Sequence, residues 1–167
     1  MKTKIALGGG CHWCTEAVFQ SLIGVGMVEQ GYVASIGEQH AFSEAVIVHF
    51  NTEMISLRTL IDVHLQTHNS TSNHSMRKKY RSAIYAFSEN QKIECERLLA
   101  SFQNEYDGKL ITKVYIFSKF KASREAIQDY YLKNPEKPFC KTFITPKLKK
   151  LRKLHGNKLK AKTINYD

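Results

Sequence analysis

The sequence predicts an α+β protein, a ferredoxin-like α/β sandwich built on split β-α-β units, with additions at its C-terminal end. Two observations lead to this fold class. Short alternating or β-branched segments are interleaved with longer segments in which apolar residues recur every three to four positions. Their order is β-α-β-β-α-β, followed by an α-β addition. With 167 residues, 43% of them hydrophobic, the chain is expected to form one domain with a substantial core.

The first half of the chain supplies the first two helices and three of the strands. Apolar residues at helical spacing define the helices; Gly24 stops the first, and Ser56 is suited to cap the second. The third strand is strongly β-branched, and its period of two puts Glu44 on one face with Val46 and Val48. The predicted elements are strands at 3–9, 25–35 and 44–50 and helices at 11–23 and 57–67.

The second half opens with residues 68–75, a stretch too polar for a helix or a strand and typical of a functional loop. Ser88-Glu89-Asn90-Gln91 has the pattern of a capping box, so we expect a helix to follow it. The other predicted elements are strands at 80–87 and 110–117 and a short helix at 123–132 closed by Asn134-Pro135. The predicted division is a folded domain at 1–150 and a basic C-terminal tail at 151–167.

The net charge is +10, and positive charge is concentrated near the C-terminus. From Lys147 to Lys162 there are eight Lys or Arg residues and no acid. The favoured interpretation is an amphipathic helix with Leu148, Leu151 and Leu154 on one side and a solvated basic face; the alternative is a patch for nucleic acid or anionic lipid. Because no base-stacking aromatic series accompanies the charges, we expect neither nucleic acid nor a membrane as a partner.

The sequence also bears on the compartment. No segment approaches the roughly 20 apolar residues of a membrane helix, and three glycines cut the N-terminal apolar run short of a signal-peptide core. We therefore expect a cytoplasmic protein, and a monomer. In the cytoplasm four cysteines do not indicate a disulfide framework, and a Cys-x-x-Cys pair is more typical of catalysis or metal binding.

Cys11 stands between three glycines and a predicted helix. The expected arrangement is a strand, a tight turn in which backbone can approach a ligand, and a thiol on the first helical turn. A helix N-terminus stabilises a thiolate by roughly 0.3–1 kcal/mol, which is less than one pKa unit. From a free value of about 8.5, Cys11 would stay mostly protonated at neutral pH. Either another group, such as His12, assists, or the proton leaves during the reaction.

Cys14 follows Cys11 by three residues, which suits a redox pair. Cβ atoms at positions i and i+3 of a helix lie about 5–6 Å apart, whereas a disulfide needs roughly 3.5–4.5 Å, so a modest distortion of the first turn would close the bond. Cys11 would attack and Cys14 would resolve. Of the remaining thiols, Cys95 is expected to be buried and structural, and Cys140 is either structural, the favoured interpretation, or a second shuttle thiol.

A Cys-x-x-Cys pair alone leaves two other functions open. A thioredoxin-like thiol-disulfide oxidoreductase has the same order of strand, turn, dithiol and helix, but all three prolines come late and none is placed for a cis-proline beside the dithiol. A non-enzymatic zinc module could use the two cysteines with His68 and His74, although that spacing fits no common zinc pattern; His64 and His68 could also be ligands.

Several motifs together point to one family. Gly10-Cys11-His12-Trp13-Cys14 closely resembles the Gly-Cys-Phe-Trp signature of A-type peptide methionine sulfoxide reductases. Further stretches match that family in the same order, so the resemblance extends from about residue 4 to about residue 150. They are Gly24-Val25, Gly31-Tyr32, Glu44-Ala45-Val46, His68, Tyr80 to Ile84, Asn134-Pro135, Phe139-Cys140 and Ile144 to Lys147.

The resemblance implies a definite reaction, with residues 1–150 as the catalytic domain. The Cys11 thiolate would attack the sulfur of a methionine S-sulfoxide, free or in a protein, and an acid would protonate the departing oxygen. Methionine would leave, and Cys11 would remain as a sulfenic acid. Cys14 would then form an intramolecular disulfide that thioredoxin reduces, in a repair of oxidised proteins that needs no cofactor or metal.

The same resemblance assigns roles outside the dithiol. Glu44 matches the proton donor, and a carboxyl among apolar neighbours is favoured in its protonated form; the alternative is an exposed strand-end glutamate. Tyr80 matches the tyrosine that hydrogen-bonds the sulfoxide oxygen, or it is a half-buried strand tyrosine. Trp13 would hold the methyl group of the substrate, and His12 and Tyr32 would also line the substrate site.

The sequence departs from the family pattern around that site. His12 replaces the usual Phe, so one wall of the methyl pocket would be polar and titratable. The loop between Tyr32 and Glu44 is shorter than usual, Ser75 stands where a pocket aspartate is expected, and Arg77-Lys78-Lys79 replace Gly-Thr-Gln. The chemistry is therefore expected to be retained, while the substrate preference stays open.

Overall fold

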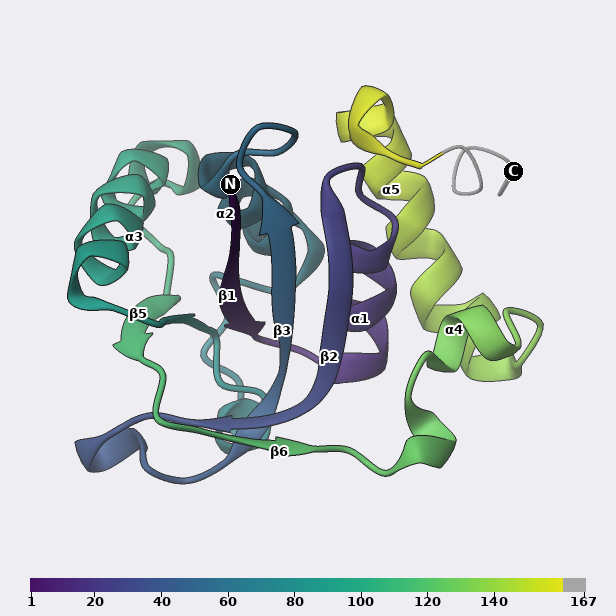
Figure 1. Ribbon diagram of the computed structural model, residues 1–167, viewed down its shortest axis with the longest axis horizontal. Coiled ribbons are helices and arrows are strands. Elements are labelled where there is room, and N and C mark those ends of the chain that lie inside the picture. Colours follow the sequence, from purple (N-terminus) through teal and green to yellow (C-terminus); the bar gives the residue numbers. More distant parts are fainter. Residues whose placement is uncertain (161–167) are drawn as a thin grey trace.

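The computed structural model describes residues 1–160, which form a six-stranded sheet with helices packed against it (Figure 1). The strand order is β5-β4-β1-β3-β2-β6, and every neighbouring pair is antiparallel except β4 and β5. β3 lies between β1 and β2, and β1 lies between β3 and β4, which is the predicted split β-α-β arrangement. The strands are β1 (Lys2–Gly8), β2 (Val25–Ala34), β3 (Ser43–Asn51), β4 (Ala83–Ala86), β5 (Lys113–Ile116) and β6 (Lys119–Ala122).

The larger core lies between one face of the sheet and the helices. Ile5 and Leu7 of β1 and Val46 and Val48 of β3 point into it, as the period of two predicts for β3. In the view of Figure 1, α1 and α2 lie behind the sheet, with α3 at one edge and α5 at the other. The helices are α1 (His12–Gln20), α2 (Leu57–Thr67), α3 (Glu89–Phe102), α4 (Tyr130–Lys133) and α5 (Thr145–His155).

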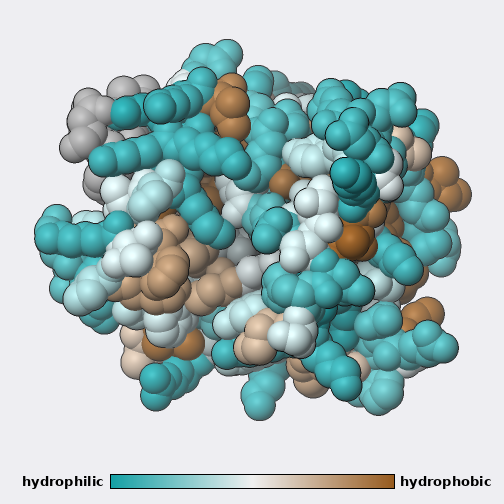
Figure 2. Space-filling model, turned by 180° about the vertical axis from the view of Figure 1, so that it is seen from behind, coloured by the Kyte–Doolittle hydropathy of each residue, from teal (hydrophilic) through white to brown (hydrophobic). Residues whose placement is uncertain are grey.

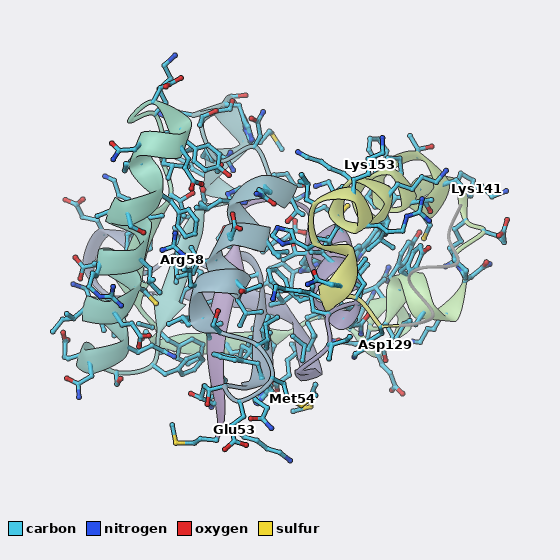
Figure 3. The ribbon with its side chains drawn as sticks, turned by 90° about the horizontal axis from the view of Figure 1, so that it is seen from above. Glu53, Met54, Arg58, Asp129, Lys141 and Lys153 are labelled. Carbon is cyan, nitrogen blue, oxygen red and sulfur yellow. The ribbon has the colours of Figure 1, made fainter. Side chains whose placement is uncertain are left out.

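The helix starts follow the predicted caps. Ser56 accepts a hydrogen bond from the backbone N–H of Thr59, and Ser88 accepts one from that of Gln91. Arg58, at the start of α2, donates to Ser101 of α3 and stacks on the ring of Phe102 (Figure 3). None of the helices within residues 1–160 is both long and apolar enough to cross a membrane.

Two predicted elements differ from the structure, and one strand of the structure was not predicted. The strand predicted at 80–87 is shorter, because Tyr80 belongs to the turn before β4, where its N–H donates to the Met76 carbonyl. The helix predicted at 123–132 is broken into a 3₁₀ turn at Glu125–Ile127 and the short α4, because Asp129 takes a left-handed backbone conformation (φ 53°). The edge strand β6 was not predicted, since its four residues carry two lysines and little apolar pattern.

The basic C-terminal segment begins as the predicted amphipathic helix. Leu148 and Leu151 of α5 are buried, whereas Leu154 is 51% exposed. Figure 3 shows Lys153 on α5, and Lys141 before it, extending outward from this edge of the molecule. Helix α5 crosses the domain boundary predicted at residue 150, and the buried Leu159 bridges to Leu22. The start of the predicted tail at 151–167 is therefore part of the folded domain, and residues 161–167 lie outside the described residues.

Candidate active site

The glycine turn between β1 and α1 brings the chain into close contact with neighbouring elements. A Cβ atom on Gly8 would stand 2.9 Å from the carbonyl oxygen of Glu44, and one on Gly9 would collide with the ring of His68. Real Cβ atoms do not approach other atoms this closely, so these positions require glycine. The turn therefore fixes the start of α1 against β3 and against the end of α2.

Cys11 is the N-cap of α1, and its carbonyl accepts hydrogen bonds from the N–H groups of Cys14 (3.1 Å) and Thr15 (3.2 Å). The pKa of Cys11 is lowered, above all because the Cys14 thiol donates a hydrogen bond to its sulfur. The N–H groups of Trp13 and Cys14 act in the same direction, whereas burial and the charge of Glu44 oppose it. The additional lowering of the Cys11 pKa, which the helix terminus alone could not supply, thus comes from the Cys14 thiol and not from His12.

Cys14 is buried, and donating to Cys11 raises its own pKa strongly. The positive charge of Lys147, at the start of α5, acts in the opposite direction. Lys147 is held in place by a hydrogen bond from its Nζ to the Thr67 carbonyl (2.9 Å). The two thiols are therefore unequal: Cys11 is the more acidic of the two, and Cys14 keeps its proton while Cys11 is a thiolate.

Glu44 of β3 lies beside this turn and is 6% exposed. Its Oε1 accepts a hydrogen bond from the backbone N–H of His12 (3.2 Å) and lies 3.3 Å from Nε2 of the His12 ring. Its Oε2 lies 3.7 Å from Nζ of Lys79. The carboxyl is thus buried as expected for a proton donor, but it meets two basic groups in addition to its apolar strand neighbours.

His12 does not line an accessible pocket. Only 3% of the residue is exposed, and Nδ1 of the ring lies 2.7 Å from the carbonyl oxygen of Gly31. Burial is the main reason that the pKa of His12 is lowered. The expected polar wall of the methyl pocket is therefore a buried imidazole that faces Glu44.

Two tyrosines approach the same region, one from strand β2 and one from the turn before β4. Tyr32 of β2 is directly opposite Glu44 in the β2–β3 register, and its ring meets the His12 ring edge-on with centroids 5.2 Å apart. Tyr80, before β4, interacts with Lys79, whose Nζ lies 5.2 Å from the centre of the tyrosine ring and whose pKa is raised chiefly by a hydrogen bond with Tyr80. The structure thus brings both predicted tyrosines to the environment of Glu44.

Trp13 belongs to an aromatic cluster that sequence reasoning did not predict. Its ring stacks on Tyr130 of α4, with centroids 4.1 Å apart and an interplanar angle of 11°, and meets Phe139 edge-on at 5.0 Å. Phe143, 53% exposed, extends the cluster to the surface. Figure 2 shows hydrophobic side chains gathered on this side of the molecule, below a hydrophilic surface.

Glu16 anchors the short helix that carries Tyr130. This buried carboxylate accepts hydrogen bonds from the N–H groups of Asp129 (3.1 Å) and Tyr130 (3.2 Å) and from the side chain of Gln30 (2.9 Å). A carboxylate at a helix N-terminus satisfies donors that have no partner within the helix. The position of Tyr130 against Trp13 is therefore fixed from within α1 itself.

Arg77 stabilises the loop between α2 and β4 through hydrogen bonds to backbone carbonyls. Its guanidinium donates to the carbonyls of Ser72 (2.8 Å), Gly9 (2.8 Å) and Tyr80 (2.9 Å), and also to that of Asn69. One side chain thereby joins the polar loop, the tyrosine and the glycine turn. Sequence reasoning noted Arg77 only as a departure from the family pattern; a lone cation in a polar loop gives no signal of this role.

The buried histidines are engaged in structural hydrogen bonds. His64 Nε2 bonds the Gly8 carbonyl (2.8 Å), and burial lowers the pKa of His64 to about 4. His68 stacks on His64, bonds its carbonyl and also bonds Ser82 (2.8 Å). Within residues 1–160, no three His, Cys, Asp or Glu side chains are arranged to hold a metal ion, so the zinc-module alternative has no support there.

The remaining cysteines are buried, as expected. Burial raises the pKa of Cys95, in the core of α3, to about 12. Cys140 begins a π-helical turn at Cys140–Ile144, is fully buried, and has its pKa raised by burial. Cys140 and Cys14 belong to the same core cluster, and the charge of Cys140 acts to raise the pKa of Cys14.

Comparison with known proteins decides the family. A family model described as peptide methionine sulfoxide reductase matches residues 3–159. The chain belongs to this family. The matched range covers the glycine turn, the dithiol, Glu44 and α5, and membership of this family rules out the alternative of a thioredoxin-type fold.

Individual members agree over nearly the whole chain. Peptide methionine sulfoxide reductase MsrA of Trichodesmium erythraeum is 32% identical over 96% of this chain and 100% of its own length, and that of Psychrobacter sp. is 34% identical over 89% and 94%. The reduced form of Mxr1 from Saccharomyces cerevisiae shares the fold, with a TM-score of 0.71, 23% identity and coverage of 85% and 91% of the two chains. Mxr1 has also been crystallised in complex with Trx2.

Proposed function

We propose that this protein reduces methionine S-sulfoxide, free or in proteins, to methionine, and that it repairs proteins after oxidation. The observation that carries the proposal is Cys11, a helix-capping thiol whose pKa is lowered, beside the buried carboxyl of Glu44. Membership of the peptide methionine sulfoxide reductase family supports the same reaction. The proposed chemistry needs no bound cofactor and no metal.

In the first step the Cys11 thiolate attacks the sulfur of the sulfoxide. Glu44 donates a proton to the sulfoxide oxygen, the S–O bond of methionine breaks, and the oxygen leaves on Cys11 as a sulfenic acid. Methionine sulfur gains two electrons and Cys11 sulfur loses two. An oxygen that must leave as a neutral hydroxyl needs a proton donor within hydrogen-bond reach, which is the role proposed for Glu44.

The remaining side chains would hold the substrate. The ring of Trp13, which stacks on Tyr130 and meets Phe139 edge-on, offers a rigid apolar surface for the methyl group of the sulfoxide. The phenol of Tyr80 is suited to donate a hydrogen bond to the sulfoxide oxygen, and Tyr32 is suited to support Glu44 from the neighbouring strand. His12, because it is buried, would act on the acid and not on the methyl group.

In the second step Cys14 would condense with the Cys11 sulfenic acid, forming a disulfide and releasing water. Oxidation of Cys11 ends its thiolate state, which is the main reason that Cys14 retains its proton. A dithiol reductant of the thioredoxin class would then reduce the disulfide; the crystallised complex of yeast Mxr1 with Trx2 supports this class. Cys140, close to Cys14, is the alternative resolving thiol.

The test is turnover of the S-epimer and of the R-epimer of methionine sulfoxide, as the free amino acid and in a peptide, with dithiothreitol as reductant. We expect reduction of the S-epimer only, with Cys11→Ser abolishing it and Glu44→Gln lowering the rate about 100-fold. The control is Cys95→Ser, which changes a thiol remote from the site. The proposal is wrong if neither form of the S-epimer is reduced above the Cys11→Ser background.

The resolving role is tested separately. Cys14→Ser is expected to allow one stoichiometric turnover and to abolish cycling with thioredoxin, whereas Cys140→Ser should cycle normally. Undiminished cycling of Cys14→Ser would assign the resolving role to Cys140. A cytoplasmic location and a monomeric state remain predictions from the sequence, to be checked by cell fractionation and by light scattering.

A further inference from the structure

The reaction proposed above uses Glu44 as an acid and assigns His12 to that acid, but it does not specify how the buried ring acts on the carboxyl. His12 is 3% exposed, so its imidazole cannot be a surface residue that happens to lie nearby. Burying an imidazole without polar partners is costly; here Nδ1 is hydrogen-bonded to the Gly31 carbonyl, and Nε2 lies 3.3 Å from Glu44 Oε1. The identity of those partners determines where its protons are.

The first partner fixes the tautomer. Nδ1 lies 2.7 Å from the Gly31 carbonyl oxygen, which can only accept a hydrogen bond. Nδ1 therefore carries a hydrogen in both the neutral and the cationic ring. In the neutral ring Nε2 then presents a lone pair and not a hydrogen.

The second partner requires a proton between the two side chains. Nε2 lies 3.3 Å from Glu44 Oε1, and both atoms are acceptors when the ring is neutral and the carboxyl is ionised. Two acceptors facing each other in a buried site repel. The contact is favourable only if one proton is shared, either as neutral His12 with protonated Glu44 or as cationic His12 with ionised Glu44.

The other neighbours of Glu44 explain why a proton shared with His12 would assist the proposed acid. Nζ of Lys79 lies 3.7 Å from Oε2, and the backbone N–H of His12 donates to Oε1. A cation and a hydrogen-bond donor both favour an ionised carboxylate, and an ionised carboxylate has no proton to give. A glutamate in this position needs a group that keeps a proton on or next to it.

We propose that His12 is a positioning residue that holds one proton jointly with Glu44 and thereby keeps the acid supplied for protonation of the sulfoxide oxygen. This inference rests on the proposed function. The shared proton leaves with the sulfoxide oxygen as Cys11 becomes a sulfenic acid. It is restored later in the cycle: a reducing dithiol delivers two protons to the disulfide, Cys14 keeps one, and Cys11, regenerated as a thiolate, releases the other to the pair.

The groups around the ring act in opposite directions. Burial lowers the pKa of His12, the hydrogen bond to Gly31 and the charge of Glu44 raise it, and the charge of Lys79 lowers it. From the other elements, Tyr32 of β2 meets the ring edge-on at 5.2 Å. The charge of Glu44 also acts on Cys11 of α1. The effect of the shared proton should therefore be visible in the pH dependence of the first step.

The experiment is the pH profile of a single turnover with methionine S-sulfoxide, comparing His12→Phe and His12→Gln with the unaltered protein. Without the shared proton, Glu44 beside Lys79 must take its proton from solvent, so the rate should fall about tenfold per pH unit in alkaline solution. We expect the ratio of unaltered to variant rates to rise by about tenfold or more between about pH 6 and about pH 8. A ratio that is constant with pH would mean that His12 only packs the site, and would overturn the inference.

A second measurement does not depend on activity or on the variants of His12. In ¹⁵N-histidine NMR spectra, His12 should carry a hydrogen on Nδ1 throughout, and Glu44→Gln should move the titration of its Nε2 to lower pH. The opposite tautomer, or an unchanged titration, would overturn the inference even if the enzyme is active. Absence of all turnover, together with the expected Nδ1 tautomer and the expected shift in Glu44→Gln, would instead count against the proposed function alone.

Discussion

Replacing Cys14 by Ala or by Ser separates its two proposed tasks, because serine keeps a hydrogen-bond donor and neither residue can form a disulfide. The Cys14 thiol is the largest single cause of the lowered pKa of Cys11, ahead of the N–H groups of α1. Cys14→Ala removes that donor, whereas the hydroxyl of Cys14→Ser can replace it. The two variants should therefore differ in the reactivity of Cys11 and agree in failing to cycle.

The size of the effect follows from the geometry of the N-cap. A hydrogen bond to a charged acceptor contributes about 1.5–3 kcal/mol, and the weak S–H donor belongs at the lower end of that range. Since one pKa unit corresponds to about 1.4 kcal/mol, Cys14→Ala should raise the pKa of Cys11 by about one unit. The N–H groups of Trp13 and Cys14 remain in the variant, so part of the lowering should persist.

The assay is the rate of alkylation of Cys11 by iodoacetamide as a function of pH, followed by mass spectrometry of the peptide that contains it. Cys95 and Cys140 are buried with raised pKa values and should react far more slowly, so they serve as internal controls. Equal midpoints for Cys14→Ala and the unaltered protein would refute the reasoning. A raised midpoint in Cys14→Ser equal to that in Cys14→Ala would show that the donor hydrogen bond is not the cause.

Three further outcomes follow from the buried polar contacts. Folded His64 binds its proton only below about pH 4, whereas an unfolded histidine binds it near pH 6.5. The free energy of unfolding, measured by urea denaturation, should therefore fall by about 3 kcal/mol from pH 6.5 to 4. It should fall less steeply in His64→Gln. Arg77→Lys cannot reproduce the four carbonyl contacts of the guanidinium, so it should lower the free energy of unfolding by about 2 kcal/mol. The control is Arg97→Lys, on the exposed side of α3, which should change it little. Equal effects of the two substitutions would contradict the role of the Arg77 guanidinium. Glu16→Ala should release α4 and shift the fluorescence of Trp13, the single tryptophan, to longer wavelength; an unshifted spectrum would exclude the anchor.

The order of the elements could be predicted because local signals agree with the tertiary structure. Apolar periodicity and caps at Ser56 and Ser88 identified helices that the core then stabilises. The elements that were not predicted correctly lack this agreement between local sequence signals and tertiary structure. β6 is a strand only because β2 offers it an edge, and the helix expected before Asn134 is interrupted where Asp129 adopts a left-handed conformation and donates its N–H to Glu16.

The candidate active site shows the same difference. Residues that are adjacent in sequence could be predicted, whereas contacts between distant segments could not. Cys11 and Cys14 were recognised because turn, dithiol and helix are adjacent in sequence, and the resemblance supplied Glu44, Trp13 and Tyr80. No local pattern reveals that Glu44 and Tyr32 are paired across β2 and β3, or that Tyr130 lies on Trp13. Such contacts depend on strand register and on chain segments more than 100 residues apart.

The charged groups around Glu44 affect the pKa of the Cys11 thiol. An ionised Glu44 raises the pKa of Cys11, so the acid needed to release the sulfoxide oxygen opposes the thiolate needed to attack the sulfur. A proton shared with His12 removes this conflict, because the pair then carries no net negative charge beside Cys11. Lys79 contributes in the same sense from the other carboxyl oxygen, and its charge also reaches Cys11. The histidine within the dithiol motif and the lysine that precedes Tyr80 are two departures from the family pattern that look unrelated in sequence. Both act on one carboxyl group, and both reduce its negative charge beside Cys11.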